Sequence, residues 1–312
     1  MVIGRFGRRN VILLVAVALV LHQISRQLEL PPTASSAGAA RKEPEFFVHP
    51  NQAGSWIGNH WIPPPYWRLR NATELQTIFR HRSVLFIGDS TARRTAATLY
   101  HILWEPRKGY QTYADLSSPE VIDINKHEVV DPCETKPFSD YNHTVFCRQM
   151  PGGSGHFVMT GVACLHEIDK VLKYWPDWRQ HFDLVVLGAG IWECTLRGRE
   201  HCKTNETKLE KFDRIVQKLP VEDVDVVWRT TGYSAFPKAR KAVDDLNAHV
   251  IGRIHQMSHP NLTYIDWGAA VYDRSFGENR IAGDIDAHYG LEPRLVAIQM
   301  LANHLIDKGG EL

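Results

Sequence analysis

Short apolar runs alternate along the chain with segments of helical periodicity. Continuous apolar runs predict strands that are buried on both faces, as in a parallel sheet. Apolar residues spaced three and four apart predict helices that cover such a sheet. The predicted strands are residues 83–87, 121–124, 156–160, 183–188, 225–229 and 262–266, and the predicted helices are residues 91–104, 165–175, 209–219 and 291–305. This alternation predicts an α/β fold in which a mostly parallel sheet lies between helical layers, a three-layer α/β/α domain.

The N-terminus follows a different pattern, an apolar run that comes directly after arginines. Arg5, Arg8 and Arg9 precede the run, which covers residues 11–21 and continues to residue 24. This length is short for a full membrane span, which takes about 20 residues. No cleavage site with small residues follows the run closely, so we expect an uncleaved signal anchor with the arginines in the cytosol. A cleaved signal peptide, which would give a secreted protein, is the alternative.

The chain then divides into four parts. We expect a cytosolic tail at residues 1–10, a transmembrane signal anchor at 11–25, and a stem rich in proline, alanine and serine at 26–53. Residues 54–312 form the lumenal domain. Three tryptophans and a proline run between residues 54 and 67 open this domain, and we expect them to pack against its edge, with sugar stacking as the alternative.

Composition limits the possible partners. At 312 residues with 44% apolar residues, the chain can form one large α/β domain or two small ones. Its formal net charge is only +1, so no electrostatic field favours nucleic acid, and we expect no nucleic-acid partner.

Glycosylation sequons support a lumenal location. Four Asn-x-Ser/Thr sequons follow the apolar run, at Asn71, Asn142, Asn205 and Asn261. Together with the anchor they predict a single-pass type II membrane protein of the secretory pathway, in the Golgi.

The chain has five cysteines, which an oxidising compartment would allow to pair. By neighbourhood in the sequence we expect Cys133 to pair with Cys147 and Cys194 with Cys202, leaving Cys164 as a buried thiol. A zinc site that uses His143, His201 and nearby cysteines is the alternative. Because no C-x-x-C or H-E-x-x-H spacing occurs, we expect no metal.

The first predicted strand ends in Gly88-Asp89-Ser90, and a predicted helix follows. Catalytic groups of open α/β sheets gather at the carboxyl ends of the strands, so Ser90 is a candidate nucleophile. Backbone N–H groups in the first helical turn could stabilise an oxyanion. The alternative is an ordinary turn in which Asp89 or Ser90 is only the helix N-cap.

A nucleophilic serine needs a base, and the base needs a group that orients it. His288 lies just before the last predicted helix, close to Asp284 and Asp286. Asp284 is four residues from His288 and would share a helical face with it, whereas a loop would allow either aspartate. A second serine, Ser154, lies in a near Gly-x-Ser-x-Gly sequence, but a predicted strand rather than a helix follows it.

These motifs, in this order, resemble the SGNH (GDSL-type) hydrolase superfamily. Gly-Asp-Ser-x-x-Arg, with Arg93 three residues after Ser90, resembles its PC-esterase branch, which includes trichome-birefringence-like polysaccharide O-acetyltransferases and the lumenal domain of sialate and fungal capsule O-acetyltransferases. The tryptophan-rich lead-in, the segment from 185 to 192 and the Asp/His pair fit the same branch. The resemblance covers roughly residues 54–307.

The resemblance implies which residues bind the oxyanion or substrate. This sequence also differs from the family motifs at two places. The candidates are Gly153, Gly188, Gly190 and Arg93, where Gly152 and Gly155 are alternatives to Gly153. The third family block often supplies an asparagine donor, which is absent from residues 188–191. The family's Asp-x-x-His spacing is also absent, since Ile285 lies three residues before His288, and this leaves Asp284 and Asp286 both open.

The resemblance implies a glycan or polysaccharide O-acetyltransferase that acts through an acyl-serine. No bound cofactor is expected; the acetyl donor is a co-substrate, with acetyl-CoA one candidate, and the partners are a glycan acceptor and the membrane. The alternatives are a carbohydrate or lipid ester hydrolase and a non-catalytic glycan-binding protein. Arg229, Tyr233 and the tryptophans are candidate acceptor contacts, and burial or packing explains each of them equally well.

Overall fold

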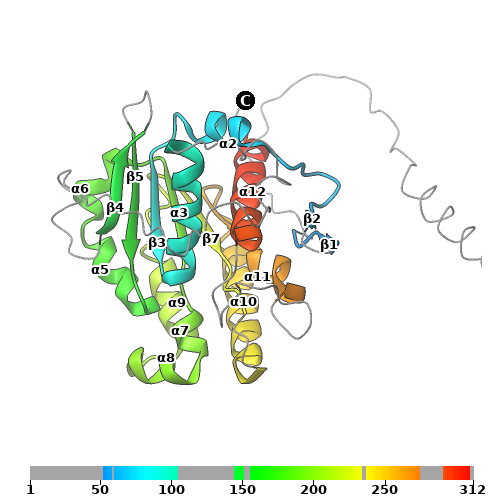
Figure 1. Ribbon diagram of the computed structural model, residues 1–312. Coiled ribbons are helices and arrows are strands. Elements are labelled where there is room, and N and C mark those ends of the chain that lie inside the picture. The colour runs from blue at the N-terminus through cyan, green and yellow to red at the C-terminus, as the bar shows by residue number, and fades with distance from the viewer. Residues whose placement is uncertain are drawn as a thin grey trace, which may run out of the picture. The chain divides into compact units, whose positions relative to one another are not determined.

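A mostly parallel sheet organises the described part of the chain (Figure 1). The computed structural model describes residues 52–57, 60–104, 144–150, 155–233, 237–274 and 291–309, which all belong to one compact unit, residues 44–312. Within these residues the sheet has six strands in the order β4-β5-β3-β6-β7-β8. The strands are β3 (Val84–Gly88), β4 (Thr144–Gln149), β5 (His156–Gly161), β6 (Leu184–Gly188), β7 (Asp225–Arg229) and β8 (Leu262–Ile265). β4 pairs antiparallel with β5 at one edge, and the other pairs are parallel.

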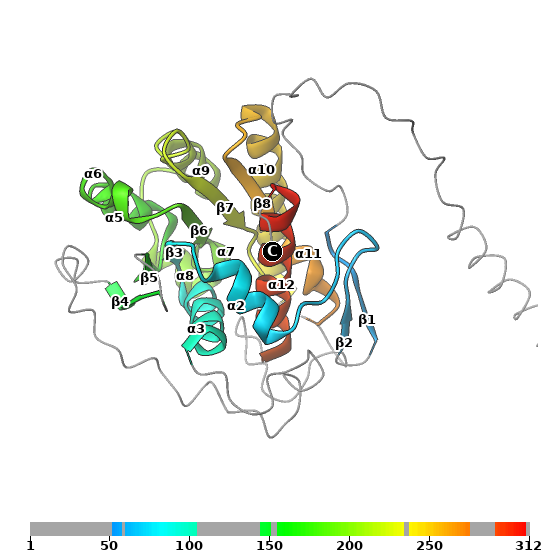
Figure 2. The same cartoon turned by 90° about the horizontal axis from the view of Figure 1, so that it is seen from above.

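Helices cover both faces of this sheet, which explains the continuous apolar runs (Figure 2). α2 (Ala72–Phe79), α3 (Ser90–Trp104) and α12 (Leu291–Asp307) lie on one face, and α5 (Ile168–Leu172), α9 (Lys208–Val216) and α10 (Pro237–Met257) lie on the other. All five residues of β3 are buried. Val84 and Phe86 belong to the apolar core on the first face, and Leu85 and Ile87 belong to the core on the second. This confirms the predicted α/β fold with a mostly parallel sheet.

Short elements complete the described chain. They are β1 (Ser55–Ile57), β2 (His60–Ile62), α6 (Trp175–Trp178), α7 (Ile191–Cys194), α8 (Leu196–His201), α11 (Trp267–Ala270), and the 3-10 turns η2 (Leu165–Glu167), η3 (Arg179–His181) and η4 (Tyr272–Arg274). β1 and β2 pair antiparallel within the tryptophan-rich lead-in. Trp56 Nε1 donates to the Ala270 carbonyl at 2.7 Å, and Trp67 Nε1 donates to Asp307 Oδ2 at 2.8 Å. Trp61 is fully buried, so the tryptophans pack against the domain as expected.

The structure confirms most predicted elements and adds others. The predicted strands β3, β5, β6, β7 and β8 and the helices α3 and α12 are present within one or two residues. The predicted helix 165–175 is instead η2 followed by the short α5, and the predicted helix 209–219 ends at Val216. Besides the short elements named above, the additions are α2, β4 and α10. The predicted strand at 121–124 lies outside the described residues.

The predicted tail, signal anchor and most of the stem, residues 1–51, also lie outside the described residues. Among the helices that the structure describes, none has the length and apolar character to cross a membrane.

The disulfide prediction is partly wrong. Cys164 and Cys202 form a disulfide bond with their Cα atoms 5.4 Å apart, and Cys194 is a buried free thiol. The cause is the direction of α7, which turns Cys194 toward α10, where its Sγ donates to the Ala242 carbonyl at 3.2 Å. Cys147 is disulfide-bonded, and Cys133, its predicted partner, lies outside the described residues.

Candidate active site

Three glycines lie side by side where the central strands end. Gly88 of β3 is in register with Gly161 of β5 and with Gly188 of β6. A Cβ atom at Gly88 would lie 2.3 Å from the Gly188 carbonyl oxygen and 2.5 Å from Cβ of Ala92. The end of β3, the end of β6 and the first turn of α3 therefore approach one another too closely for any side chain at Gly88.

Ser90 is the first residue of α3 and is half-buried. The residue before it caps the helix, because Asp89 Oδ1 accepts hydrogen bonds from the Thr91 N–H at 2.9 Å and from the Ala92 N–H at 3.4 Å. The sequence left Asp89 and Ser90 both open as the N-cap of α3, and the structure shows that Asp89 is the cap. The start of this helix therefore does not need the Ser90 hydroxyl. The same bonds occupy two of the N–H groups that were expected to stabilise an oxyanion.

Thr91 links Asp89 to a buried arginine. The Thr91 hydroxyl donates to Asp89 Oδ1 at 2.6 Å and accepts from Arg229 Nη2 at 2.7 Å. Arg229 is 2% exposed at the end of β7, and its guanidinium carbon lies 4.1 Å from the centre of the Trp267 ring. An arginine this deeply buried does not contact an acceptor directly. Through its hydrogen bond to Thr91, Arg229 instead holds the turn that carries Ser90.

The loop after β6 is fixed by its glycines. The Gly188 carbonyl accepts from the Asp89 N–H at 3.2 Å, and a Cβ atom at Gly188 would lie 2.8 Å from Arg229 Nε. Gly190 has φ of +125°, and a Cβ atom there would lie 2.6 Å from Leu246 Cδ2. These two predicted substrate-binding glycines therefore also have a packing role, which sequence alone did not separate from binding.

A side-chain amide near this loop does not replace the missing asparagine of the third family block. Asn247 lies in α10, but its amide oxygen accepts from the Thr231 N–H and its Nδ2 donates to the Thr231 carbonyl, both at 2.8 Å. Both ends of this amide are bonded to the backbone of Thr231, which follows β7, so the amide does not donate to an oxyanion.

Arg93 lies one turn after Ser90 on α3 and is exposed. Among the described residues its guanidinium forms no hydrogen bond or ion pair. Arginine at this position can bind a negatively charged substrate group.

A buried carboxyl group, which sequence reasoning missed, lies close to this turn. Glu193 of α7 is 5% exposed, and its Oε1 accepts from the Leu165 N–H at 2.6 Å. Burial raises the pKa of Glu193 to about 7, and the charge of Asp89 adds to the rise, while the Leu165 N–H and the Lys211 charge oppose it. The residue pattern gave no indication, since Glu193 is the single acidic residue within α7.

The proposed base and its orienter are not placed by the structure. His288, Asp284, Asp286 and Gly153 lie outside the described residues. The helix that begins three residues after His288 is anchored at the edge where Ser90 lies. In its first turn the Pro293 carbonyl accepts from Trp267 Nε1 at 2.7 Å, and the Trp267 ring packs on Arg229.

The described sequons differ in exposure. Asn71 is exposed at the start of α2, where its Oδ1 accepts from the Glu74 N–H at 2.9 Å. Asn205 is exposed after α8, and Asn261 is half-buried, with its Nδ2 donating to the Val221 carbonyl at 3.0 Å. Asn142 lies outside the described residues.

One group of possible metal ligands occurs among the described residues. Cys164, Glu193 and Cys202 place one ligand atom each within 4.8 Å of one another. Both sulfur atoms belong to a disulfide bond and so do not offer the thiolates that zinc binds.

Comparison with known proteins leaves the family open. No protein-family model matches this chain, and no curated protein matches it.

Proposed function

We propose that this protein is a serine-dependent O-acetyltransferase of the SGNH type that modifies glycans in the secretory pathway. One observation supports it above all others. A serine begins the helix that follows the central parallel strand, at the sheet edge where catalytic groups of α/β folds gather, and the neighbouring Asp89 makes that serine unnecessary as a cap.

The proposed reaction has two steps. Ser90 Oγ attacks the carbonyl carbon of an acetyl donor as His288 takes the hydroxyl proton, and either Asp284 or Asp286 orients the imidazole. The bond from the carbonyl to the leaving group breaks, the leaving group receives the proton, and acetyl-Ser90 forms. A sugar hydroxyl then attacks the carbonyl carbon of acetyl-Ser90 as His288 takes its proton. The bond from this carbon to Ser90 Oγ breaks, and His288 returns the proton to Ser90 Oγ. Transfer to the sugar returns Ser90 to its free form.

The described residues contribute positioning and charge. Arg229, Thr91 and Asp89 hold the turn that presents Ser90, and Gly88 and Gly188 allow that turn to lie against the end of β6. Arg93 is the cation that we propose for binding negative charge on the donor or the acceptor. The Ser90 N–H and Gly153 are the proposed backbone donors to the oxyanion.

Transfer to a sugar, rather than to water, rests on the sequence. The apolar N-terminal run, the proline-rich stem, the four sequons and the Gly-Asp-Ser-x-x-Arg motif favour a membrane-anchored enzyme that acts on glycans. An ester hydrolase would use the same serine, with water as the acceptor.

The test of the serine is hydrolysis of p-nitrophenyl acetate by the full-length chain. Ser90→Ala should lose turnover by about a thousandfold or more, because no other group replaces the nucleophile. Ser83→Ala is the matched control, since it removes the same atom just before β3, at the opposite end of the strand. Equal turnover in Ser90→Ala and Ser83→Ala would refute the proposal.

A second experiment separates the acceptors. The full-length chain is incubated with a labelled acetyl donor and a panel of glycans, and labelled glycan and labelled acetate are measured. Label in glycan supports the transferase, whereas label only in acetate supports the hydrolase. Neither product, with no p-nitrophenyl acetate turnover, favours a non-catalytic glycan-binding protein.

A further inference from the structure

A groove lies between the start of α9, the end of α8 and α10. It has a volume of about 820 Å³. Its charged lining includes three lysines and three acids: Lys203, Lys208, Lys211, Glu193, Glu206 and Asp245. Nothing in the proposed acyl transfer uses this groove.

Lys211 is a buried cation in the groove. It is 3% exposed, and its Nζ donates to the Cys202 carbonyl at 2.5 Å. Among the described residues no carboxylate lies within ion-pair distance of this ammonium group. A buried charge is costly unless an opposite charge or several hydrogen bonds compensate it. An anion bound in the groove would therefore compensate the buried charge of Lys211.

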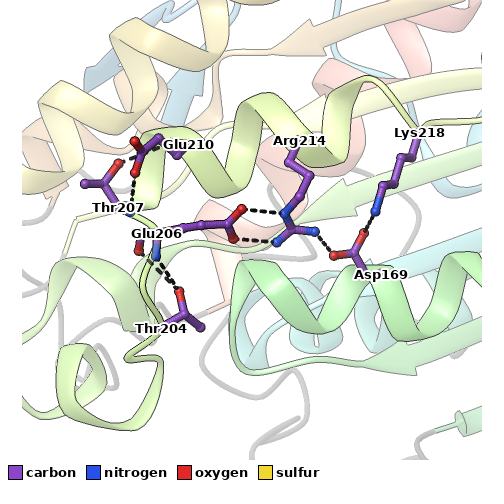
Figure 3. A network of polar contacts seen from close by, with 7 residues as sticks. All are labelled: Asp169, Thr204, Glu206, Thr207, Glu210, Arg214 and Lys218. Atoms are coloured by element: carbon purple, nitrogen blue, oxygen red, sulfur yellow. Dashed lines mark hydrogen bonds and ion pairs between the residues drawn. The ribbon is translucent and has the colours of Figure 1, made fainter.

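The acids of the groove are largely neutralised by cations outside it. Glu206 accepts from Arg214 Nε at 2.8 Å and from Arg214 Nη2 at 2.9 Å, and Figure 3 shows Arg214 held between Glu206 and Asp169. Asp245 pairs with Lys241 at 2.8 Å. Glu206 and Asp245 therefore offer little charge to the groove lysines.

Lys203 and Lys208 remain with their charges exposed to the groove. Within the described part of the chain neither Nζ forms a hydrogen bond or an ion pair. Together with Lys211 they give the groove an excess of positive charge that its own acids do not balance.

We propose that this groove binds a small organic anion that carries a phosphate, sulfate or carboxylate group. The three lysines contact the oxyanion, and the volume of the groove matches an organic ligand rather than a lone ion, since ligand pockets take up roughly 300–1,000 Å³. Such a ligand would balance Lys211 without entering the Ser90 site.

Glu193 makes this binding depend on pH. Glu193 lines the groove, and its carboxyl group accepts from the Leu165 N–H and interacts with the charges of Lys211 and Asp89. The pKa of Glu193 is raised to about 7, mainly by burial, so below this pH the group is neutral and no longer repels an anion. His249 also lines the groove and pairs with Asp213.

The test is isothermal titration of the full-length chain with sodium sulfate, with sodium chloride at equal ionic strength as the baseline. We expect saturable sulfate binding that Lys208→Gln weakens by about tenfold. Lys173→Gln is the matched control, because Lys173 is an exposed lysine that does not line the groove. Lys211→Met should abolish binding, and its folding is checked by circular dichroism.

Binding that does not exceed the chloride baseline would overturn the proposal, as would an equal loss in Lys173→Gln and Lys208→Gln. Sulfate keeps its charge across neutral pH, so it also tests Glu193: binding at about pH 6 should be about fivefold tighter than at about pH 8, and Glu193→Gln should remove the difference. A difference that persists in Glu193→Gln would contradict the role of Glu193.

Organic ligands distinguish the sources of the oxyanion. A sugar phosphate, a sugar sulfate and glucuronate are titrated in parallel, and the one that binds most tightly identifies the class. If none binds more tightly than inorganic sulfate, the groove is not a site for an organic anion. These binding measurements do not depend on the activity of Ser90.

Discussion

Thr91 joins two buried charged side chains behind Ser90. Its hydroxyl donates to Asp89 and accepts from Arg229, which comes from a strand 138 residues further along the chain. Because both partners are buried, neither can replace the lost bond with water. The position of the Ser90 turn therefore depends on a side chain that the sequence presents as an ordinary helix residue.

Thr91→Val keeps the shape of the side chain and removes both hydrogen bonds. We expect it to lower the free energy of unfolding by about 2 kcal/mol, measured by urea denaturation. Thr95→Val is the control in the same helix. Among the described residues the Thr95 hydroxyl makes one hydrogen bond, to the Thr91 carbonyl, and its loss should cost less than about 1 kcal/mol. An equal loss of unfolding free energy in the two variants would show that the hydrogen bonds of Thr91 to Asp89 and Arg229 add no extra stability.

Sequence predicted the place of Ser90 but not what surrounds it. The apolar run before Gly88 identified a buried strand, and the helical run after it identified the turn. The choice between Asp89 and Ser90 as the cap needed hydrogen bonds, and the roles of Arg229 and Glu193 needed contacts between distant segments. A single sequence does not show which distant residues meet.

At the scale of elements, α7 depends on the backbone at Gly190. This residue caps α7 with φ of +125°, a conformation that residues with a side chain rarely adopt, and Leu246 of α10 packs against the position of its missing Cβ. The start of α7 thus fixes Glu193 and the loop after β6 against α10.

Gly190→Ala should therefore destabilise the fold by about 2 kcal/mol or more, because it adds both backbone strain and a clash. Gly252→Ala is the matched control within α10, since a Cβ atom there meets nothing within 4 Å. It should stabilise the helix by about 0.5–1 kcal/mol. Thermal unfolding should show a lower melting temperature for Gly190→Ala and a higher one for Gly252→Ala than for the wild-type chain. A Gly190→Ala variant as stable as the wild type would contradict the strain assigned to Gly190.

Strands with continuous apolar runs and the helices α3 and α12 were predicted well, whereas β4 and α10 were missed. β3 and β6 lie in the centre of the sheet, so burial on both faces left a clear pattern. β4 is an edge strand with only two buried residues, and its pattern is weak. α10 is mostly polar, although its buried residues Val243, Leu246, Val250 and Ile254 recur at intervals of three and four and could have identified it.

At the scale of the whole molecule, one disulfide bond ties two distant turns together. Cys164 precedes η2 and Cys202 follows α8, at a sequence separation of 38. Closing a loop of this length stabilises the folded chain by about 4 kcal/mol in the chain-entropy picture. Sequence neighbourhood favoured Cys194 because it is nearer to Cys202, but the packing of α7 on α10 turns it away.

Counting free thiols in the denatured full-length chain decides between the two pairings. Cys194→Ala should lower the count by one, because Cys194 is the buried free thiol among the described residues. A pairing of Cys194 with Cys202 would instead leave Cys202 unpaired and raise the count by one. Burial also raises the pKa of Cys194 to about 12, so the thiol should react with alkylating reagents only after unfolding.

The proposed activity joins distant parts of the chain at one edge of the sheet. Ser90 follows β3, and the first turn of α12, three residues after His288, contacts Trp267 at the same edge. We propose that His288, three residues before this helix, is the base that serves Ser90.

The most direct measurement is to trap the acyl-enzyme. The full-length chain reacts briefly with p-nitrophenyl acetate, the reaction is stopped with acid, and peptides are sequenced by mass spectrometry. The account predicts an acetyl group on Ser90 in the wild-type chain and its loss, together with turnover, in Ser90→Ala. Turnover that continues without acetyl-Ser90 would contradict the account.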